Sequence, residues 1–151
     1  MKVLATGFRH LSTIGGVTPG GSFYAQTHSR GIGAHGCITF LKHLVTCLSD
    51  RLLVIWDGTP SHRSHEIQSY LRANSQLRIQ IEPLPAYAPE LNPVEGVWQQ
   101  LKHVELRNIC CENYSDLRKL ISSAVIRLRR KPQLIQSFFH QSGLRIDEPK
   151  T

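Results

Sequence analysis

The sequence predicts an α/β domain, in which a mixed sheet carries helices on its faces. From residue 37 onward, stretches with apolar residues three and four positions apart alternate with short apolar runs, which is the pattern of alternating helices and strands. Ahead of them, residues 9–28 have the pattern of an antiparallel hairpin with its turn at Thr18-Pro19-Gly20-Gly21. With 151 residues, the chain is long enough for one domain with its own core.

The predicted elements follow a regular order along the chain. We expect strands at residues 10–17, 22–27, 52–56 and 77–82, and helices at 37–49, from Ser61 or Ser64 through Leu71, from Pro93 through Leu101, and from Ser115 up to Pro132. A short segment at 134–139 is expected to pack back on them. We therefore expect a single domain over residues 1–151, with its core at residues 8–131 and a frayed tail at 143–151.

The run Leu52–Trp56 is the predicted central strand. It is apolar throughout, as is typical of a strand that is covered on both faces. Farther along the chain, four prolines between residues 83 and 93 predict a stiff, extended connection into the next helix.

The net charge of +7 and the isoelectric point near 9.6 favour a polyanionic partner, because Lys and Arg release condensed counterions when they bind phosphates. No apolar run reaches the roughly 20 residues that span a bilayer. The first seven residues are too short and too quickly polar to form a signal peptide. We therefore expect a cytoplasmic protein without a membrane segment.

The four cysteines favour reduced thiols, because two of them are adjacent and no CxxC motif occurs. A structural zinc site is the alternative. The ligand types for it are present, although their spacing matches no familiar site, in His35, Cys37, His43 and Cys47.

Two carboxylates occupy positions suited to a metal site. Asp57 ends the predicted central strand, where functional groups of α/β sheets gather, and Gly58 lets the chain turn beside it. Glu95 stands at the start of a predicted helix. Magnesium takes hard oxygen ligands, and phosphodiester transfer commonly uses two such ions, so the pair points to a nuclease-type or strand-transfer reaction.

Each acid also has a purely structural interpretation. Asp57 can be a turn aspartate, because Asp-Gly is common in turns. With Asn92 as N-cap and Pro93 at the first helical position, Glu95 becomes the glutamate of a capping box. The two residues taken singly leave both interpretations open.

Two longer segments carry a family resemblance. The first is Val54-Ile55-Trp56-Asp57-Gly58-Thr59-Pro60-Ser61-His62-Arg63-Ser64. The second is Leu84-Pro85-Ala86-Tyr87-Ala88-Pro89-Glu90-Leu91-Asn92-Pro93-Val94-Glu95-Gly96-Val97-Trp98-Gln99-Gln100-Leu101-Lys102. Together they resemble the mariner-like bacterial insertion-sequence transposases of the DDE superfamily, and the resemblance extends from Phe8 to Leu128.

The resemblance implies a ribonuclease H-like core and a set of site residues. Asp57 matches the second catalytic aspartate, Glu95 matches the third catalytic acid, and His62 matches a histidine that often follows the aspartate. Asn92 belongs to the same motif as a supporting residue. Gly58 departs from the family, which usually has Asn there.

The resemblance also implies a reaction and its partners. The reaction is cleavage and transfer of DNA strands with Mg²⁺ or Mn²⁺ bound by the two acids. The partners are double-stranded DNA, as transposon ends and target, and a second copy in a homodimer. The basic residues that we expect to contact nucleic acid are Arg63, Lys102, Arg127 and Arg130.

One departure from the family bears on activity. The family carries its first catalytic aspartate on a first strand ahead of the hairpin, whereas no Asp or Glu precedes Asp50 here. We therefore expect a sheet that lacks its first strand and a chain that is inactive or incomplete alone. It would be the carboxy-terminal part of a transposase, from a truncated element or from a frame joined to an upstream one. The alternatives are a non-catalytic DNA-binding remnant and an unstable remnant with an exposed sheet edge.

Overall fold

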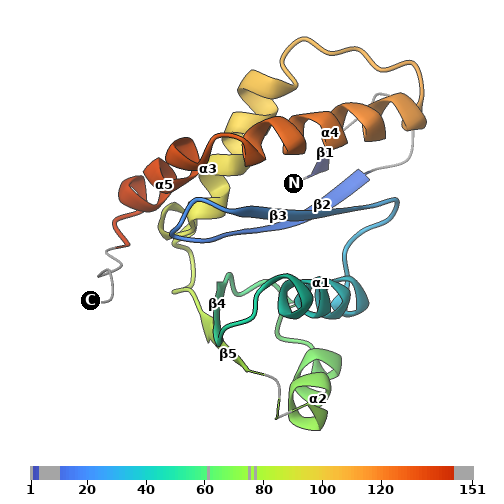
Figure 1. Ribbon diagram of the computed structural model, residues 1–151. Helices are drawn as coiled ribbons and strands as arrows, with labels where there is room; N and C mark the ends of the chain where they lie inside the picture. The colour runs from blue at the N-terminus through green and yellow to red at the C-terminus, as the bar shows by residue number, and fades with distance from the viewer. Residues whose placement is uncertain (1, 4–10, 61, 75, 77, 145–151) are drawn as a thin grey trace.

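The computed structural model describes residues 2–3, 11–60, 62–74, 76 and 78–144. Two small sheets and five α-helices make up this part of the chain (Figure 1). The strands are β1 (Lys2–Val3), β2 (Leu11–Val17), β3 (Phe23–His28), β4 (Leu52–Trp56) and β5 (Ile79–Pro83). The helices are α1 (Ala34–Cys47), α2 (His65–Ala73), α3 (Pro93–Gln100), α4 (Tyr114–Arg129) and α5 (Pro132–Gln141), with a 3-10 turn at Pro89–Leu91 and a π-helical turn at Leu101–Glu105.

The first sheet confirms the predicted hairpin. β2 and β3 are antiparallel, with Val17 opposite Phe23, and the amide of Gly21 donates to the carbonyl of Thr18 over 2.9 Å to close the turn. Gly21 has a φ of 91°, which a glycine adopts without strain. The strand β1 was not predicted; it pairs antiparallel with the beginning of β2. The predicted start of the hairpin at His10 lies outside the described residues.

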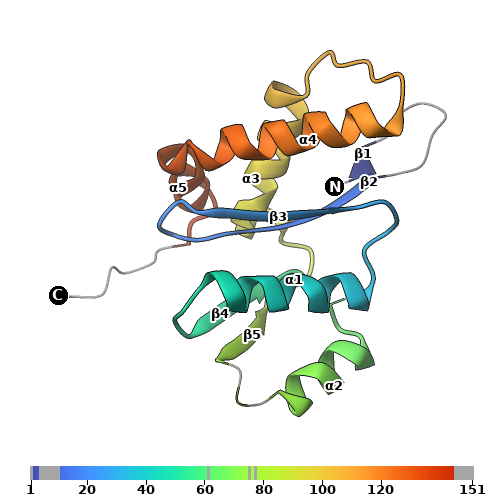
Figure 2. The same ribbon diagram turned by 45° about the vertical axis from the view of Figure 1, so that its right-hand side comes forward.

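Helices cover both faces of this sheet (Figures 1 and 2). On one face, Leu11 and Phe23 pack with apolar side chains of α3, α4 and α5. The buried members of that core are Leu11, Phe23, Val97, Leu101, Leu117, Ile121, Ala124, Val125, Leu128, Ile135 and Phe138. On the other face lies α1, where the ring of Phe40 stands 3.7 Å from the position that a Cβ of Gly16 would take. The first sheet is thus the middle layer of the molecule.

The second sheet holds only β4 and β5, which are parallel, with α2 in the connection between them. The prediction that β4 is covered on both faces is wrong, because Leu53 is 58% exposed and Ile55 is 45% exposed. An apolar run does not reveal whether another element packs on each of its faces. The face of β4 that carries Leu53 and Ile55 is left to solvent.

The expectation of a single mixed sheet is also wrong, since the described strands form two separate sheets. In the described part of the chain, no strand joins β2 to β4. Leu52 N donates to Arg78 O over 2.6 Å, and Trp56 O accepts from Leu84 N over 2.7 Å, so these groups face β5. Because strand residues alternate, the amide and carbonyl groups of Leu53 and Ile55 face the open edge. The expectation that the strand ahead of the hairpin is missing is wrong, because β1 precedes the hairpin and pairs with β2, whereas this edge of β4 has no partner strand within the described residues.

The helix boundaries differ from expectation where capping decides them. Ser64 caps α2, because its Oγ accepts from Ile67 N over 3.4 Å, whereas Ser61 lies outside the described residues. Asn113 caps α4 in place of Ser115, through a 2.9 Å bond from Asp116 N to its Oδ1. The beginning of α1 lies three residues before the predicted position, at Ala34 after Gly33.

The last helix is longer than predicted, and most of the predicted tail lies outside the described residues. Pro132 ends α4 as expected, and it also begins α5, a helix of 10 residues in place of the short segment at 134–139. Proline suits the first helical position, because no intrahelical partner for its nitrogen exists there. Most of the predicted frayed tail, residues 145–151, lies outside the described residues. None of the described helices is long and apolar enough to cross a membrane.

Candidate active site

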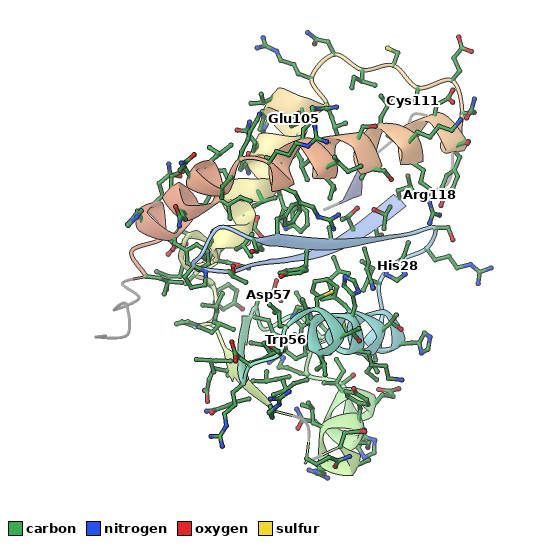
Figure 3. All side chains as sticks on the ribbon, viewed as in Figure 1. His28, Trp56, Asp57, Glu105, Cys111 and Arg118 are labelled. Carbon is green, nitrogen blue, oxygen red and sulfur yellow. The ribbon has the colours of Figure 1, made fainter. Side chains whose placement is uncertain are left out.

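Asp57 directly follows the last residue of β4 and turns the chain. Its Oδ1 accepts a hydrogen bond from the amide of Thr59 over 3.1 Å, which is the bond of an Asx turn. The side chain is 45% exposed, so the carboxylate faces solvent in part. Asp57 lies between the two sheets, at the end of β4 nearest the first sheet (Figure 3). The turn interpretation is therefore correct, and it leaves the carboxylate accessible.

His62 binds Asp57 at two points. Its Nδ1 lies 2.8 Å from Oδ1 of Asp57 and 2.9 Å from the main-chain oxygen of the same residue. Its ring stacks on Trp56, with centroids 4.3 Å apart and planes 8° from parallel. Only 16% of the His62 side chain is exposed. The supporting role of His62 was expected from the family resemblance alone, and its contact with Trp56 was not predicted.

Glu95 is the third residue of α3, as predicted, and Asn92 is the N-cap, with its Oδ1 accepting from Val94 N over 3.3 Å. The capping-box interpretation of Glu95 is wrong. The amide of Asn92 donates to the carbonyl of Pro89 over 3.0 Å, and no hydrogen bond within the described residues reaches the carboxylate of Glu95. The side chain is half-buried.

The charge of Asp57 acts on Glu95. Burial raises the pKa of Glu95, and the negative charge of Asp57 raises it further. Burial also raises the pKa of the Cys37 thiol, again with a contribution from Asp57. Asp57, which follows β4, is thus near enough for its charge to act on Glu95 of α3 and on Cys37 of α1. Cys37 was missed as a neighbour of the acids, because a buried cysteine on an apolar helix face gives no sign of what it packs against.

The predicted basic residues divide into two groups. Arg127 donates from Nε to Glu105 over 2.7 Å, and Lys131 donates to the same carboxylate over 3.1 Å. Glu105 lies in the helical layer, across the first sheet from Asp57 (Figure 3). Arg127 is therefore occupied by a structural ion pair away from the acids. The predicted cations that are exposed and have no ion pair within the described part of the chain are Arg63, Lys102 and Arg130.

Comparison with known proteins decides the family. The family described as DDE superfamily endonuclease matches residues 5–118. The chain belongs to this family. A curated relative, the insertion element IS630 uncharacterized 39 kDa protein of Shigella sonnei, is 34% identical over 86 residues. That match takes in 56% of this chain and 24% of the relative, so the chain spans about a quarter of the relative's length.

Solved structures of similar fold agree with membership of the DDE superfamily endonucleases. The catalytic domain of Mos1 mariner transposase has a TM-score of 0.64 at 15% identity, and the match covers 97% of this chain and 81% of that domain. A Mos1 transposase paired-end complex with the left transposon end gives 0.61 at 16% identity, over 89% of this chain and 44% of that one. The predicted ribonuclease H-like fold class and the resemblance to DDE transposases are confirmed.

The donor set of this DDE superfamily endonuclease fits part of a magnesium or manganese site. Carboxylate oxygens are the ligands that these ions prefer, and Asp57 and Glu95 supply them in one place. Among the described residues, no three or more His, Cys, Asp or Glu side chains are grouped so that they could hold a metal ion. Asp57 and Glu95 would hold such an ion, with further ligands from water, from substrate or from another acid. His35, Cys37, His43 and Cys47, the alternative zinc ligands, therefore form no such group within the described residues.

Proposed function

We propose that this chain is part of the catalytic core of a transposase that cuts and joins DNA phosphodiesters, with Asp57 and Glu95 as ligands of Mg²⁺ or Mn²⁺. The observation that carries the proposal is Glu95 itself. Its carboxylate is half-buried, has no hydrogen bond within the described residues, and has a pKa raised by burial and by Asp57. Two like charges held near each other, one at a strand end and one in a first helical turn, cost stability, and such pairs are typical of functional sites.

The chemistry follows from the charges that such a pair can hold. When bound, two divalent ions stabilise the attacking and leaving oxygens of an in-line displacement at phosphorus. The protein's part is positioning and electrostatics, because phosphoryl transfer leaves little covalent work to side chains. Asp57 holds its carboxylate at the end of a strand, and Glu95 presents its own from the first turn of α3.

We infer that a third carboxylate is needed to complete the site. No Asp or Glu precedes Asp50, and the acids described near Asp57 number too few to enclose two ions. We infer that the third acid arrives on a strand that pairs with the open edge of β4, through the backbone groups of Leu53 and Ile55. Pairing there places a residue of the new strand beside Asp57. The chain alone is accordingly expected to be inactive.

Double-stranded DNA is the proposed substrate and partner, as transposon ends and target. The net charge of +7 supports a polyanionic partner, and Arg63, Lys102 and Arg130 are the exposed cations offered to phosphates. The Mos1 relatives include a paired-end complex with a transposon end. A homodimer in the cytoplasm is the proposed assembly.

Nicking of labelled double-stranded DNA in Mn²⁺ tests the catalytic proposal. The chain is assayed alone and with a synthetic strand peptide that carries one aspartate. We expect nicking only in the mixture, and its loss in Asp57→Ala and Glu95→Ala. Glu90→Ala is the matched control, since Glu90 is an exposed acid in the same connection. Nicking that persists in both acid variants refutes the proposal.

A non-catalytic DNA-binding protein is the second candidate function. It is favoured by the basic surface of α4, where a shallow hollow is lined by Ser115, Arg118 and Lys119. In this case DNA binding survives Asp57→Ala and Glu95→Ala, no nicking occurs under any condition, and affinity falls steeply with salt. Arg118→Ala combined with Lys119→Ala then weakens binding several-fold without loss of folding.

A further inference from the structure

We propose that His62 is a positioning residue that orients the carboxylate of Asp57 for a divalent cation. The inference rests on the proposed function, because it assigns Asp57 to a metal. It goes beyond that function by naming the group that fixes the ligand before any metal arrives.

The imidazole of His62 is held independently of the carboxylate that it contacts. One restraint is the stack on Trp56, at 4.3 Å between ring centroids and 8° between planes. The other is the bond between Nδ1 and the main-chain oxygen of Asp57, at 2.9 Å. Neither restraint uses the side chain of Asp57. The ring is therefore in place whatever the carboxylate does.

The position of the ring also decides which ring nitrogen of His62 carries the hydrogen. Both oxygens near Nδ1 belong to Asp57, and a main-chain oxygen can only accept, so Nδ1 carries the hydrogen. The same nitrogen lies 2.8 Å from Oδ1, the oxygen that accepts from the amide of Thr59 over 3.1 Å. The contact with His62 and the bond from Thr59 thus hold the same oxygen. Within the described part of the chain, Oδ2 of Asp57 receives no hydrogen bond. It is the oxygen that would bind the cation.

A carboxylate that is fixed before binding loses less rotational freedom when it takes a metal. Partners that orient metal ligands typically change metal affinity by about 10–100-fold when they are removed. A histidine that only braced the turn between residues 57 and 62 would behave differently. Its loss would lower stability without a specific effect on metal affinity, and restoring the donor alone would not restore binding.

Binding of Mn²⁺ to the full chain, measured by the loss of the free-ion paramagnetic resonance signal, tests the inference. His62→Ala is expected to weaken Mn²⁺ binding by about 10-fold or more. His62→Asn places an amide donor where Nδ1 stands. Its Mn²⁺ affinity is expected to remain within about threefold of wild type, because exchanging one donor for another costs less than losing the donor. His65→Ala is the matched control, because His65 is exposed and three residues away. The inference is overturned if His62→Ala binds Mn²⁺ like wild type or if His62→Asn binds as weakly as His62→Ala.

A metal-free measurement separates this inference from the proposed function. Nitrogen NMR of the His62 ring is expected to show the proton on Nδ1, and its ring protons are expected to shift downfield when Trp56→Ala removes the stacked indole. A proton on Nε2, or no response to Trp56→Ala, overturns the inference. If wild-type chain mixed with the strand peptide that carries the third acid takes up no Mn²⁺ while the NMR expectations hold, the metal site of the proposed function is refuted and the orientation of Asp57 by His62 is left intact.

Discussion

Gly96 and Phe138 meet where α3 packs on α5. A Cβ atom on residue 96 would stand 2.5 Å from Cδ1 and 2.6 Å from Cγ of Phe138, closer than Cβ atoms approach other heavy atoms. Phe138 is buried in the core, and Gly96 directly follows Glu95. The absent side chain therefore lets α3 seat on α5, and the seating fixes the helical turn that carries the second acid.

Gly96→Ala is expected to lower the free energy of unfolding by about 1 kcal/mol. Overpacking a core contact costs about 1–3 kcal/mol, and the higher helix propensity of alanine returns about 1 kcal/mol. Chemical denaturation measures the difference. Gly31→Ala is the control, since no heavy atom lies within 4 Å of a Cβ there. A Gly96→Ala chain as stable as wild type would contradict the contact, as would an equal loss in a Phe138→Leu background, where the ring is gone.

The parts of the fold that the sequence predicted are those that local pattern decides. Turn residues placed the β2–β3 hairpin, apolar periodicity placed α4, and the Asn-Pro pair placed the start of α3 at Pro93. The positions of Asp57 at a strand end and of Glu95 in a first helical turn follow from the same local signals. Those two positions brought the acids into one candidate site.

The parts that the sequence could not predict depend on contacts between distant segments. Exposure of Leu53 depends on whether another element packs over its face of β4, which the run 52–56 does not encode. Pairing of Arg127 with Glu105 joins residues 22 apart, and the basic helix surface therefore looked freer in sequence than it is. Stacking of His62 on Trp56 depends on how the chain turns after Asp57.

Glu105→Gln is expected to destabilise the protein at neutral pH and much less in acid. The hydrogen bond from Arg127 does most to hold the pKa of Glu105 below its ordinary value of 4.5, with help from Lys131 and against the effect of burial. A lowered folded-state pKa contributes stability that is present above the unfolded-state value and is lost as pH falls through the folded-state value. The side chain of Glu105 is 6% exposed, so we expect a loss of about 1–2 kcal/mol at pH 7.

Thermal or denaturant unfolding of wild type and Glu105→Gln across pH 3–7 measures this dependence. The two curves should converge as pH falls below the ordinary value of 4.5. Glu112→Gln, at an exposed position, is the control and should follow wild type throughout. A gap between wild type and Glu105→Gln that stays constant over the whole range would contradict the ion pair.

The four thiols are expected to react with iodoacetamide in a set order. Cys47 and Cys110 are exposed and should be alkylated first. Cys37 should react last, because it is buried and because burial, with the charge of Asp57, raises its pKa and lowers its thiolate fraction. Mass spectrometry of partly alkylated chain gives the order, and denaturant should abolish it. Early alkylation of Cys37 in folded protein would contradict its burial.

Lysine on the solvent face of β4 is expected to reduce self-association with little loss of stability. Leu53 and Ile55 are exposed apolar side chains beside an open strand edge, and such edges recruit strands from other chains. Leu53→Lys with Ile55→Lys should raise the soluble fraction severalfold in light scattering, while each change shifts the free energy of unfolding by about 0.5 kcal/mol or less. Val54→Lys is the control, because Val54 is partly buried on the opposite face and its replacement should destabilise the fold.

The double variant of Leu53 and Ile55 should also weaken pairing with the strand peptide that supplies the third acid. Unchanged precipitation would show that the edge of β4 is not what draws chains together.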